Sequence, residues 1–334
     1  MIAHEEVCIM IYPSFIHEGG IIGICAPSAG VGRKLEDFDR SIAWLNKQGY
    51  QTYETANVRI NDPRGGTAEQ RGAELNSLFA DDDIDVIMCA AGGDFLDEMI
   101  PYADFDLMAQ HPKWLYGLSD PTGLLFPYTC MCDVATIYGC NAGSYDIDPL
   151  PEYLEGQATY LRGECAPQHS WTHHVSDPFA DELDMSEETV FGSNVDAIHT
   201  SGRCIGGCVD VLKDLIGTRF DHAKKFVDRY REDGTIWYFD NFCLSAECLY
   251  RTFLQFRYAG WFEHTKAVII SRTAIPSSET GMSYEEAIER AFSDIPVLYN
   301  ADLGHMPPTM AMINGAIMNL DFEKNEYEIS FQMK

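Results

Sequence analysis

Short apolar runs alternate with amphipathic stretches over the first 145 residues. Apolar runs over residues 20–28, 84–90 and 134–138 have the length and composition of buried strands. Between the first two runs, apolar residues recur at the spacing of two helices. The first helix has Leu35, Phe38, Ile42 and Leu45; the second, with Thr67 as its N-cap, has Leu75, Leu78 and Phe79. Alternating buried strands and helices predict an α/β fold, with a doubly wound parallel sheet that has helices on both faces.

A further strand, elbow and helix are predicted around Ser119. The apolar run 114–116 is followed by a short turn, and Pro121 suits the first turn of the next helix. Such a strand–turn–helix elbow lifts a hydroxyl out of the sheet, as in the G-x-S-x-G motif, although the glycine spacing matches only partly. The alternative is that Ser119 or Asp120 simply caps the helix.

Three loops of this region follow predicted strand ends. They comprise residues 26–28, 92–93 and 119–120. In parallel sheets, ligands gather at the carboxyl ends of the strands. We therefore expect these three loops to converge on one crevice.

The chain changes character over residues 146–200. This stretch is rich in proline and acidic residues, and it has little periodicity beyond one expected helix near residues 153–161. Loops of this length are usually lids or linkers. Trp171 is expected to pack on the surface there, with stacking on a substrate base as the alternative. No metal site is expected, because thiolate or carboxylate ligands at a matching spacing are missing beside the three histidines of the segment: His169, His173 and His174.

A smaller second domain is predicted from residue 201 to the C-terminus. Its pattern predicts a short helix over residues 208–216, a strand over 235–242 with Asp240 near its end, and an amphipathic helix over 246–259. Two further strands are predicted over 267–270 and 296–305. His305 lies in the loop after the last strand. The predicted organisation is an N-terminal α/β domain, a linker or lid, and a C-terminal domain: 11–145, 146–200 and 201–334.

The charge balance restricts the partners more than it restricts the fold. The chain of 334 residues carries 23 basic and 52 acidic side chains, which gives a net charge of −29. Such a field repels phosphate backbones and anionic membranes. Nucleic acid and membrane partners are therefore not expected, and no run approaches the roughly 18 apolar residues of a membrane span.

The cysteines and the N-terminus favour a reduced, cytoplasmic protein. The 11 cysteines form no C-x-x-C pair, and several lie inside apolar runs, where a thiol behaves as a small core residue. A disulfide framework is improbable in a chain of this length. Acidic residues, Glu5 and Glu6, stand where a signal peptide needs basic ones.

Ten short motifs occur in the order of one known family, from about Ile11 to the C-terminus. They are Ala26-Pro-Ser28, Arg71, Gly92-Gly93, Pro112-Lys113, Gly117-Leu-Ser-Asp120, Tyr138-Gly139, Gly206-Gly207, Gly217-Thr218, Arg251 and Gly304-His305. Each motif is weak alone, but together and in register they are specific. In these motifs the chain resembles the LD-carboxypeptidase family of serine peptidases, which includes the microcin C immunity protein MccF.

The resemblance implies a fold, an assembly and a catalytic triad. It implies an N-terminal α/β domain, a smaller C-terminal domain rich in β-structure, a homodimer, and no metal or other cofactor. Its triad serine falls on Ser119 and its histidine on His305. A serine hydroxyl needs a base to remove its proton, and His305 is the only one of 10 histidines in a glycine-flanked loop after a strand. The backbone N–H groups of Gly93 and Asp120 would form the oxyanion hole.

The acid departs from the family pattern. Counted from Arg251, the position of the family's triad glutamate is Asp240, at the end of an apolar strand where a carboxylate is costly unless it is paired. Glu247 keeps the residue type, but it lies in the first turn of a predicted helix, where the helix dipole explains it. We therefore expect Asp240 to be the acid. Two further departures are Ala91, in place of an arginine, and Cys208, in place of an asparagine.

These observations predict a cytoplasmic serine hydrolase that cleaves an amide in a small peptide-like substrate. One substrate class is a muropeptide that loses a terminal D-amino acid; the other is an aminoacyl nucleotide antibiotic of the MccF type. The extended segment 146–200 favours the second. The alternative function is a non-catalytic binding or regulatory homologue of the same fold. The changes at positions 91 and 240 suggest it, whereas Ser119 and His305 argue against it.

Overall fold

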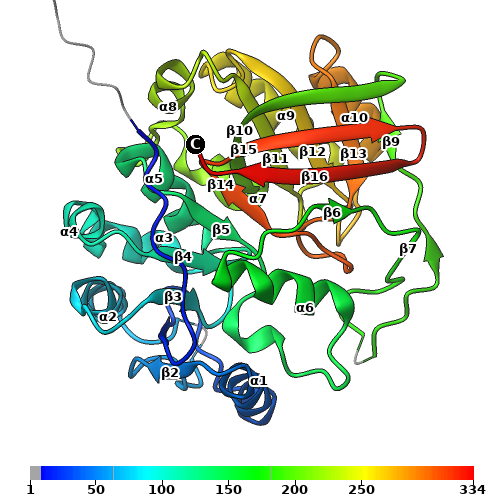
Figure 1. The fold of residues 1–334 in the computed structure, drawn as a ribbon. Coiled ribbons are helices and arrows are strands. Elements are labelled where there is room, and N and C mark those ends of the chain that lie inside the picture. Colours follow the sequence, from blue (N-terminus) through cyan, green and yellow to red (C-terminus); the bar gives the residue numbers. More distant parts are fainter. Residues whose placement is uncertain (1–8, 63, 181) are drawn as a thin grey trace, which may run out of the picture.

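Two large sheets organise the molecule. A computed structural model describes residues 9–62, 64–180 and 182–334. The N-terminal sheet has six strands and the C-terminal sheet has eight, and helices pack around both (Figure 1). The N-terminal sheet lies at the lower left of Figure 1 and the C-terminal sheet at the upper right.

The N-terminal sheet has the strand order β14-β5-β4-β3-β1-β2. Its first five strands in the chain are parallel, and β14 is antiparallel to β5. Their bounds are β1 (Ile21–Cys25), β2 (Gln51–Glu54), β3 (Val86–Cys89), β4 (Trp114–Gly117), β5 (Thr136–Tyr138) and β14 (Met312–Asn314). The order 2-1-3-4-5 is that of a doubly wound sheet, so the predicted fold class is confirmed.

The helices predicted for this half are present, and the structure has one more, over residues 105–110, that the sequence did not predict. Their bounds are α1 (Leu35–Lys47), α2 (Ala68–Ala80), α3 (Leu96–Met99), α4 (Phe105–Gln110) and α5 (Thr122–Cys132). The predicted N-cap of α2 is confirmed, because the Thr67 hydroxyl accepts a hydrogen bond from the Gln70 N–H and the Gln70 side chain accepts one from the Thr67 N–H. Strand β2 was not predicted. It has no apolar run, because its residues are all exposed or half-buried.

The C-terminal sheet has the order β6-β16-β15-β10-β11-β12-β13-β9. Four central strands are parallel and are connected by helices: β10 (Ala197–Cys208), α7 (Val209–Leu215), α8 (Ala223–Arg229), β11 (Thr235–Asp240), α9 (Ala246–Tyr258), β12 (Thr265–Ser271), α10 (Tyr284–Ala291) and β13 (Val297–Ala301). Two long antiparallel strands that the sequence pattern did not predict extend the sheet: β15 (Ile317–Glu323) and β16 (Glu326–Gln332).

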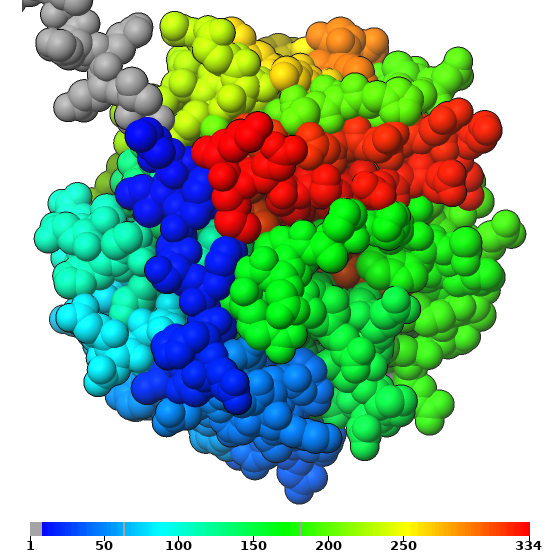
Figure 2. Space-filling model, viewed as in Figure 1, coloured from blue at the N-terminus to red at the C-terminus, as the bar shows by residue number. Residues whose placement is uncertain are grey.

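The segment 146–200 contributes structure to the C-terminal sheet. It contains α6 (Glu152–Thr159), as expected, and the short strands β6 (Gln168–His169), β7 (His173–His174), β8 (Glu187–Glu188) and β9 (Gly192–Ser193). Strand β6 pairs with β16, and β9 pairs with β13. On the face shown in Figure 2, this green segment lies between the blue N-terminal half and the red C-terminal strands.

One strand therefore crosses the predicted domain boundaries. Strand β14 comes from the C-terminal part of the chain and completes the N-terminal sheet. The bounds 145 and 200 stay a prediction, since the two sheets are built from interlaced segments. Among the described residues, no helix is both long and apolar enough to cross a membrane.

Strand β11 is a fully buried support of the functional region. All six of its residues are buried. Trp237 stacks on Phe239 with ring centroids 5.6 Å apart, and Phe239 packs against Phe253 of α9 at 5.0 Å. This aromatic packing fixes the strand rigidly up to its last residue, Asp240.

Candidate active site

Ser119 lies on a strained elbow between β4 and α5. Its φ angle is +73°, a left-handed conformation that costs a non-glycine residue about 1–3 kcal/mol. The Asn141 side chain holds the preceding residue, since it accepts a hydrogen bond from the Leu118 N–H at 3.0 Å and donates one to the Leu118 carbonyl at 3.2 Å. No side chain caps α5. The capping interpretation of Ser119 and Asp120 is therefore wrong, and the geometry is that of an elbow.

The three predicted loops do converge beside Ser119. The Ser28 hydroxyl donates a hydrogen bond to the Asp120 carboxylate, which also accepts one from the Leu96 N–H at 3.0 Å. A Cβ atom on Gly92 would lie 3.2 Å from the Ser119 Oγ, and one on Gly93 would lie 2.3 Å from the Ser28 Oγ. The close approach of the 92–93 loop thus depends on glycine. Burial raises the pKa of the Asp120 carboxyl to about 6.

Two backbone donors at this elbow remain available. In the described part of the chain, the N–H groups of Gly93 and Asp120 donate no hydrogen bond to a protein acceptor. The N–H of Ser119 itself is different, because it donates to the Tyr138 hydroxyl at 3.3 Å. The two donors predicted for an oxyanion hole are therefore those that the protein leaves unused.

The structure brings His305 and Asp240 together. The His305 Nδ1 lies 2.7 Å from the Asp240 Oδ2, an ion-pair distance with poor alignment for a hydrogen bond. The His305 backbone N–H donates to the other carboxylate oxygen at 3.3 Å. Gly304 makes this approach possible: its φ is +80°, and a Cβ atom there would lie 2.0 Å from the Asp240 carboxyl carbon.

The surroundings of His305 favour its protonated form. Burial lowers the pKa of the imidazole, but the charge of the Asp240 carboxylate and its contact with the ring raise the pKa, with a smaller contribution from Asp210. The net pKa lies above the usual value of histidine. The Phe242 ring packs on the imidazole with centroids 4.6 Å apart, which limits its rotation.

Tyr138 connects Asp240 to the serine elbow. This tyrosine ends β5 and is 1% exposed. Its hydroxyl donates a hydrogen bond to the Asp240 Oδ2 at 2.5 Å and accepts the one from the Ser119 N–H. Ser119, Tyr138, Asp240 and His305 therefore form one continuous chain of contacts between the two sheets. The sequence reasoning gave Tyr138 no role beyond its place in a shared motif.

A buried ion pair supports the His305 loop, and sequence reasoning missed it. The Arg272 guanidinium lies 2.8 Å from the Asp302 carboxylate, and both side chains are almost fully buried. Arg272 also donates hydrogen bonds to the carbonyls of Asn300 and Met306, on either side of the histidine. Asp302 in turn accepts a hydrogen bond from the Trp171 N–H at 3.0 Å. No local pattern marks this pair, because its members lie on different elements.

Glu247 has a separate structural position. It lies in the first turn of α9, which Ser245 caps. Its Oε1 accepts hydrogen bonds from the hydroxyl groups of Ser278 and Thr280 and from two backbone N–H groups of that loop. The hydrogen bonds from Thr280 hold the pKa of the Glu247 carboxyl well below its usual range. This carboxylate organises the loop 278–280.

The histidines of the segment 146–200 pair with protein groups individually. The Nδ1 of His169 lies 3.3 Å from Glu328, that of His173 lies 3.1 Å from Thr172, and that of His174 lies 3.2 Å from Thr189. Within the described ranges, they do not form a cluster of metal-ligand spacing.

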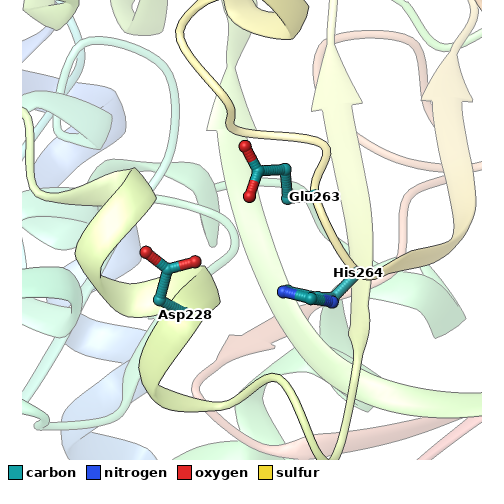
Figure 3. Close-up of side chains that lie close together, drawn as sticks. All are labelled: Asp228, Glu263 and His264. Carbon is teal, nitrogen blue, oxygen red and sulfur yellow. The ribbon is translucent and has the colours of Figure 1, made fainter.

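Elsewhere in the described structure, Asp228, Glu263 and His264 lie close enough together to hold a metal ion (Figure 3). The Lys224 ammonium lies 2.5 Å from the Asp228 carboxylate and 3.0 Å from the Glu263 carboxylate. A single protein cation thus pairs with both carboxylates and offsets one of their two negative charges. Asp228 belongs to α8, and in the described structure this group makes no contact with Ser119 or His305.

A cavity of about 340 Å³ adjoins the elbow. Its walls come from the loops after β1, β3 and β5 and from the start of α1, and they include Gly92, Asn141, Arg33 and Lys34. Gly92 lies against Ser119 and Asn141 binds Leu118, so two of the residues that line the cavity also border the elbow. A small molecule bound there would lie at the carboxyl ends of the parallel strands.

Comparisons with known proteins agree with this geometry. Residues 22–139 match the family model of the LD-carboxypeptidase N-terminal domain, and residues 201–320 match that of the LD-carboxypeptidase C-terminal domain. A putative carboxypeptidase of Vibrio cholerae is 24% identical over 96% of this chain and 98% of its own length.

Two solved structures have the same fold. One is MccF in complex with glutamyl sulfamoyl guanosine, with a TM-score of 0.80, 21% identity, and coverage of 96% of this chain and 98% of that one. The other is a muramoyltetrapeptide carboxypeptidase from Oxalobacter formigenes, with a TM-score of 0.74, 18% identity, and coverage of 93% and 98%.

Proposed function

This chain belongs to the LD-carboxypeptidase family, and on that premise we propose that it is a serine peptidase with a Ser119–His305–Asp240 triad. Ser119 is the nucleophile, His305 is the general base and acid, and Asp240 orients the imidazole. The observation that carries the proposal is the contact chain from the Ser119 backbone through Tyr138 and Asp240 to His305.

The proposed reaction proceeds in two steps. The Ser119 Oγ attacks the scissile carbonyl while the His305 Nε2 takes its proton, and the resulting oxyanion accepts hydrogen bonds from the N–H groups of Gly93 and Asp120. The C–N bond then breaks as His305 protonates the leaving amine. Water, deprotonated by His305, hydrolyses the acyl-enzyme and restores Ser119. The contact of Asp240 with Nδ1 keeps Nε2 free for these transfers.

The acid of the triad is Asp240 in this proposal. Its support is position: Asp240 contacts the His305 ring, whereas Glu247 binds the loop 278–280. Aspartate is one methylene shorter than the family's glutamate. The contact between Gly304 and the Asp240 carboxylate supports the idea that a closer histidine loop compensates for this difference.

Two substrate classes follow from the relatives. One is a muropeptide with a terminal D-amino acid, and the other is an aminoacyl nucleotide of the kind bound by MccF. We favour the aminoacyl nucleotide, because the segment 146–200 is long and its Trp171 is attached to the histidine loop through Asp302.

A side-by-side assay tests both classes. Purified protein and its Ser119→Ala variant would be incubated with a muropeptide tetrapeptide and with an aminoacyl sulfamoyl adenylate, and the products separated by mass spectrometry. We expect Ser119-dependent cleavage of the adenylate. Cleavage of the tetrapeptide alone would reverse the substrate choice, and cleavage of neither would favour the non-catalytic homologue.

We also propose a homodimer in a reducing, cytoplasmic compartment. The family resemblance supports the dimer, and the free thiol state of the described cysteines supports the compartment. Light scattering coupled to size exclusion should give twice the chain mass of 37.5 kDa. A monomer mass at micromolar concentration would contradict the dimer.

A further inference from the structure

The Tyr138 hydroxyl stands where the two halves of the site meet. It comes from β5 of the N-terminal sheet, and its acceptor, Asp240, ends β11 of the C-terminal sheet. The hydroxyl has one proton, which it donates to the Asp240 Oδ2, and it accepts the Ser119 N–H with a lone pair. The same Oδ2 atom contacts the His305 Nδ1 at 2.7 Å.

Sharing one carboxylate oxygen has two consequences. First, the oxygen is held between a tyrosine and a histidine, so the carboxylate cannot rotate away from the imidazole without losing a buried, charge-assisted hydrogen bond. Second, a donor to the carboxylate stabilises its negative charge and weakens its attraction for a proton on His305. The tyrosine therefore acts on both the orientation and the basicity of the base.

The tyrosine is a neutral donor throughout the working pH range. Burial raises the pKa of its hydroxyl far above the usual value, and the nearby Asp240 charge raises it further. A tyrosinate beside a buried carboxylate would repel it, so the proton stays on the hydroxyl. The hydroxyl therefore keeps the proton that it donates to Asp240.

We propose that Tyr138 is a positioning residue of the reaction, which fixes Asp240 against His305, limits the basicity of His305 and anchors the backbone of the nucleophile to the acid. This inference rests on the proposed triad and adds a fourth member to it. Tyr138 touches no reacting atom in the proposed reaction, and its effect reaches the substrate only through Ser119, Asp240 and His305.

The other titratable groups around the pair are accounted for. Three buried groups lie close enough to the Asp240 charge to interact with it: Cys208 at the end of β10, Tyr238 on β11 and Tyr284 on α10. Burial raises the pKa of each of them, so they stay neutral. Asp210 on α7 is the remaining charge that acts on His305. It accepts hydrogen bonds from the N–H groups of residues 242 and 243, which a change at Tyr138 does not touch.

The Tyr138→Phe variant tests the proposal, with Tyr128→Phe as its control. Tyr128 is equally buried, and its hydroxyl donates to the Met108 carbonyl at 3.0 Å, remote from the site. Tyr138→Phe loses both hydrogen bonds of its hydroxyl and Tyr128→Phe loses one, so a purely structural effect should lower the stability of both variants and leave the pH profile of both unchanged. Tyr138→Phe alone should lower kcat by about ten- to a hundredfold. It should also shift the acid limb of the pH profile of kcat/KM upward by about 0.5–1 unit.

The direction of the shift follows from the charge. His305 must be neutral to act as the base, so activity falls as the pH drops through its pKa. Without the tyrosine donor, the Asp240 charge acts more strongly on the imidazole and the pKa rises, so the acid limb moves to higher pH. An unchanged limb with an unchanged kcat would overturn the proposal, as would equal losses in Tyr128→Phe.

A second variant covers the case in which Tyr138→Phe does not fold. Substitution of Tyr138 by 3-fluorotyrosine keeps the ring and strengthens the hydroxyl as a donor, so the acid limb should move to lower pH. A shift upward, or none, would contradict the inference. If Ser119→Ala retains hydrolysis in the same assay, the proposed triad itself is wrong; if Ser119 is required but the limb does not move, only the role of Tyr138 fails.

Discussion

The two halves of the site are held in place by different means. In the N-terminal half, backbone conformation places the nucleophile: Ser119 has a left-handed φ, and the adjoining loop packs so closely that a Cβ atom on Gly93 would lie 2.3 Å from the Ser28 Oγ. In the C-terminal half, buried side chains place the acid and base. Asp240 binds Tyr138 and contacts His305, and the Arg272–Asp302 pair holds the loop that carries the histidine.

This difference separates activity from stability. The Ser119 side chain contributes little to packing, because the elbow is formed by the backbone. The side chains of the C-terminal half contribute to both activity and stability, since a buried polar group that loses its partner lowers the free energy of unfolding. Changes on the two sides should therefore give different combinations of lost turnover and lost stability.

The largest expected effect on turnover comes from Ser119→Ala. Removal of the nucleophile should lower kcat by about 10⁴- to 10⁶-fold, while the free energy of unfolding changes by less than about 0.5 kcal/mol. Steady-state assays on a confirmed substrate, together with urea unfolding, measure both. Near wild-type turnover would show that Ser119 is not the nucleophile. A large loss of stability would contradict the proposed difference between the two halves of the site.

Asp240→Asn should come next. The amide leaves His305 without its charged partner and favours the wrong tautomer, so kcat should fall by about 10⁴-fold. In contrast to Ser119→Ala, the variant should also lose about 1–3 kcal/mol of stability, because a buried acceptor of several hydrogen bonds is altered. Turnover within tenfold of the wild type would show that another group serves as the acid.

Arg272→Met should act mainly on stability. It leaves the buried Asp302 carboxylate unpaired and should cost about 3–5 kcal/mol of unfolding free energy. Turnover should fall as well, because the carbonyls on either side of His305 lose their donor. The double variant Arg272→Met/Asp302→Leu should regain part of the stability, and a double variant no more stable than the single one would contradict the ion-pair account.

The smallest effect is expected for Glu247→Gln. Its carboxylate orders the loop 278–280 and does not contact His305 in the described structure. Turnover should therefore stay within about twofold of the wild type. If Glu247→Gln removes activity while Asp240→Asn does not, the role of the acid passes to Glu247.

The sequence was informative where local pattern determines structure. Apolar runs located β1, β3 and β4, and the strand–turn–helix pattern located Ser119 at its elbow. The family resemblance pointed to Asp240, and a carboxylate at the end of an apolar strand, which needs a partner, favoured it over Glu247; the structure places His305 beside it.

The sequence was silent where structure depends on distant pairing. Strand β14 joins the other sheet, and β15 pairs with both β16 and β10, and no run of apolar residues reveals these partners. The roles of Tyr138 and of the Arg272–Asp302 pair depend on the same kind of contact between elements. Polar networks of this kind are specified by the folded geometry and not by residue periodicity.

Labelling with a fluorophosphonate tests the central claim, that His305 and Asp240 activate Ser119 across the two halves. Wild-type protein, Ser119→Ala and His305→Gln would be treated with the reagent and analysed by intact mass and peptide mapping. This activation predicts one adduct on the peptide that contains Ser119, none in Ser119→Ala, and labelling slowed by at least about 10³-fold in His305→Gln. An adduct on a different residue, or a labelling rate that does not depend on His305, would contradict it.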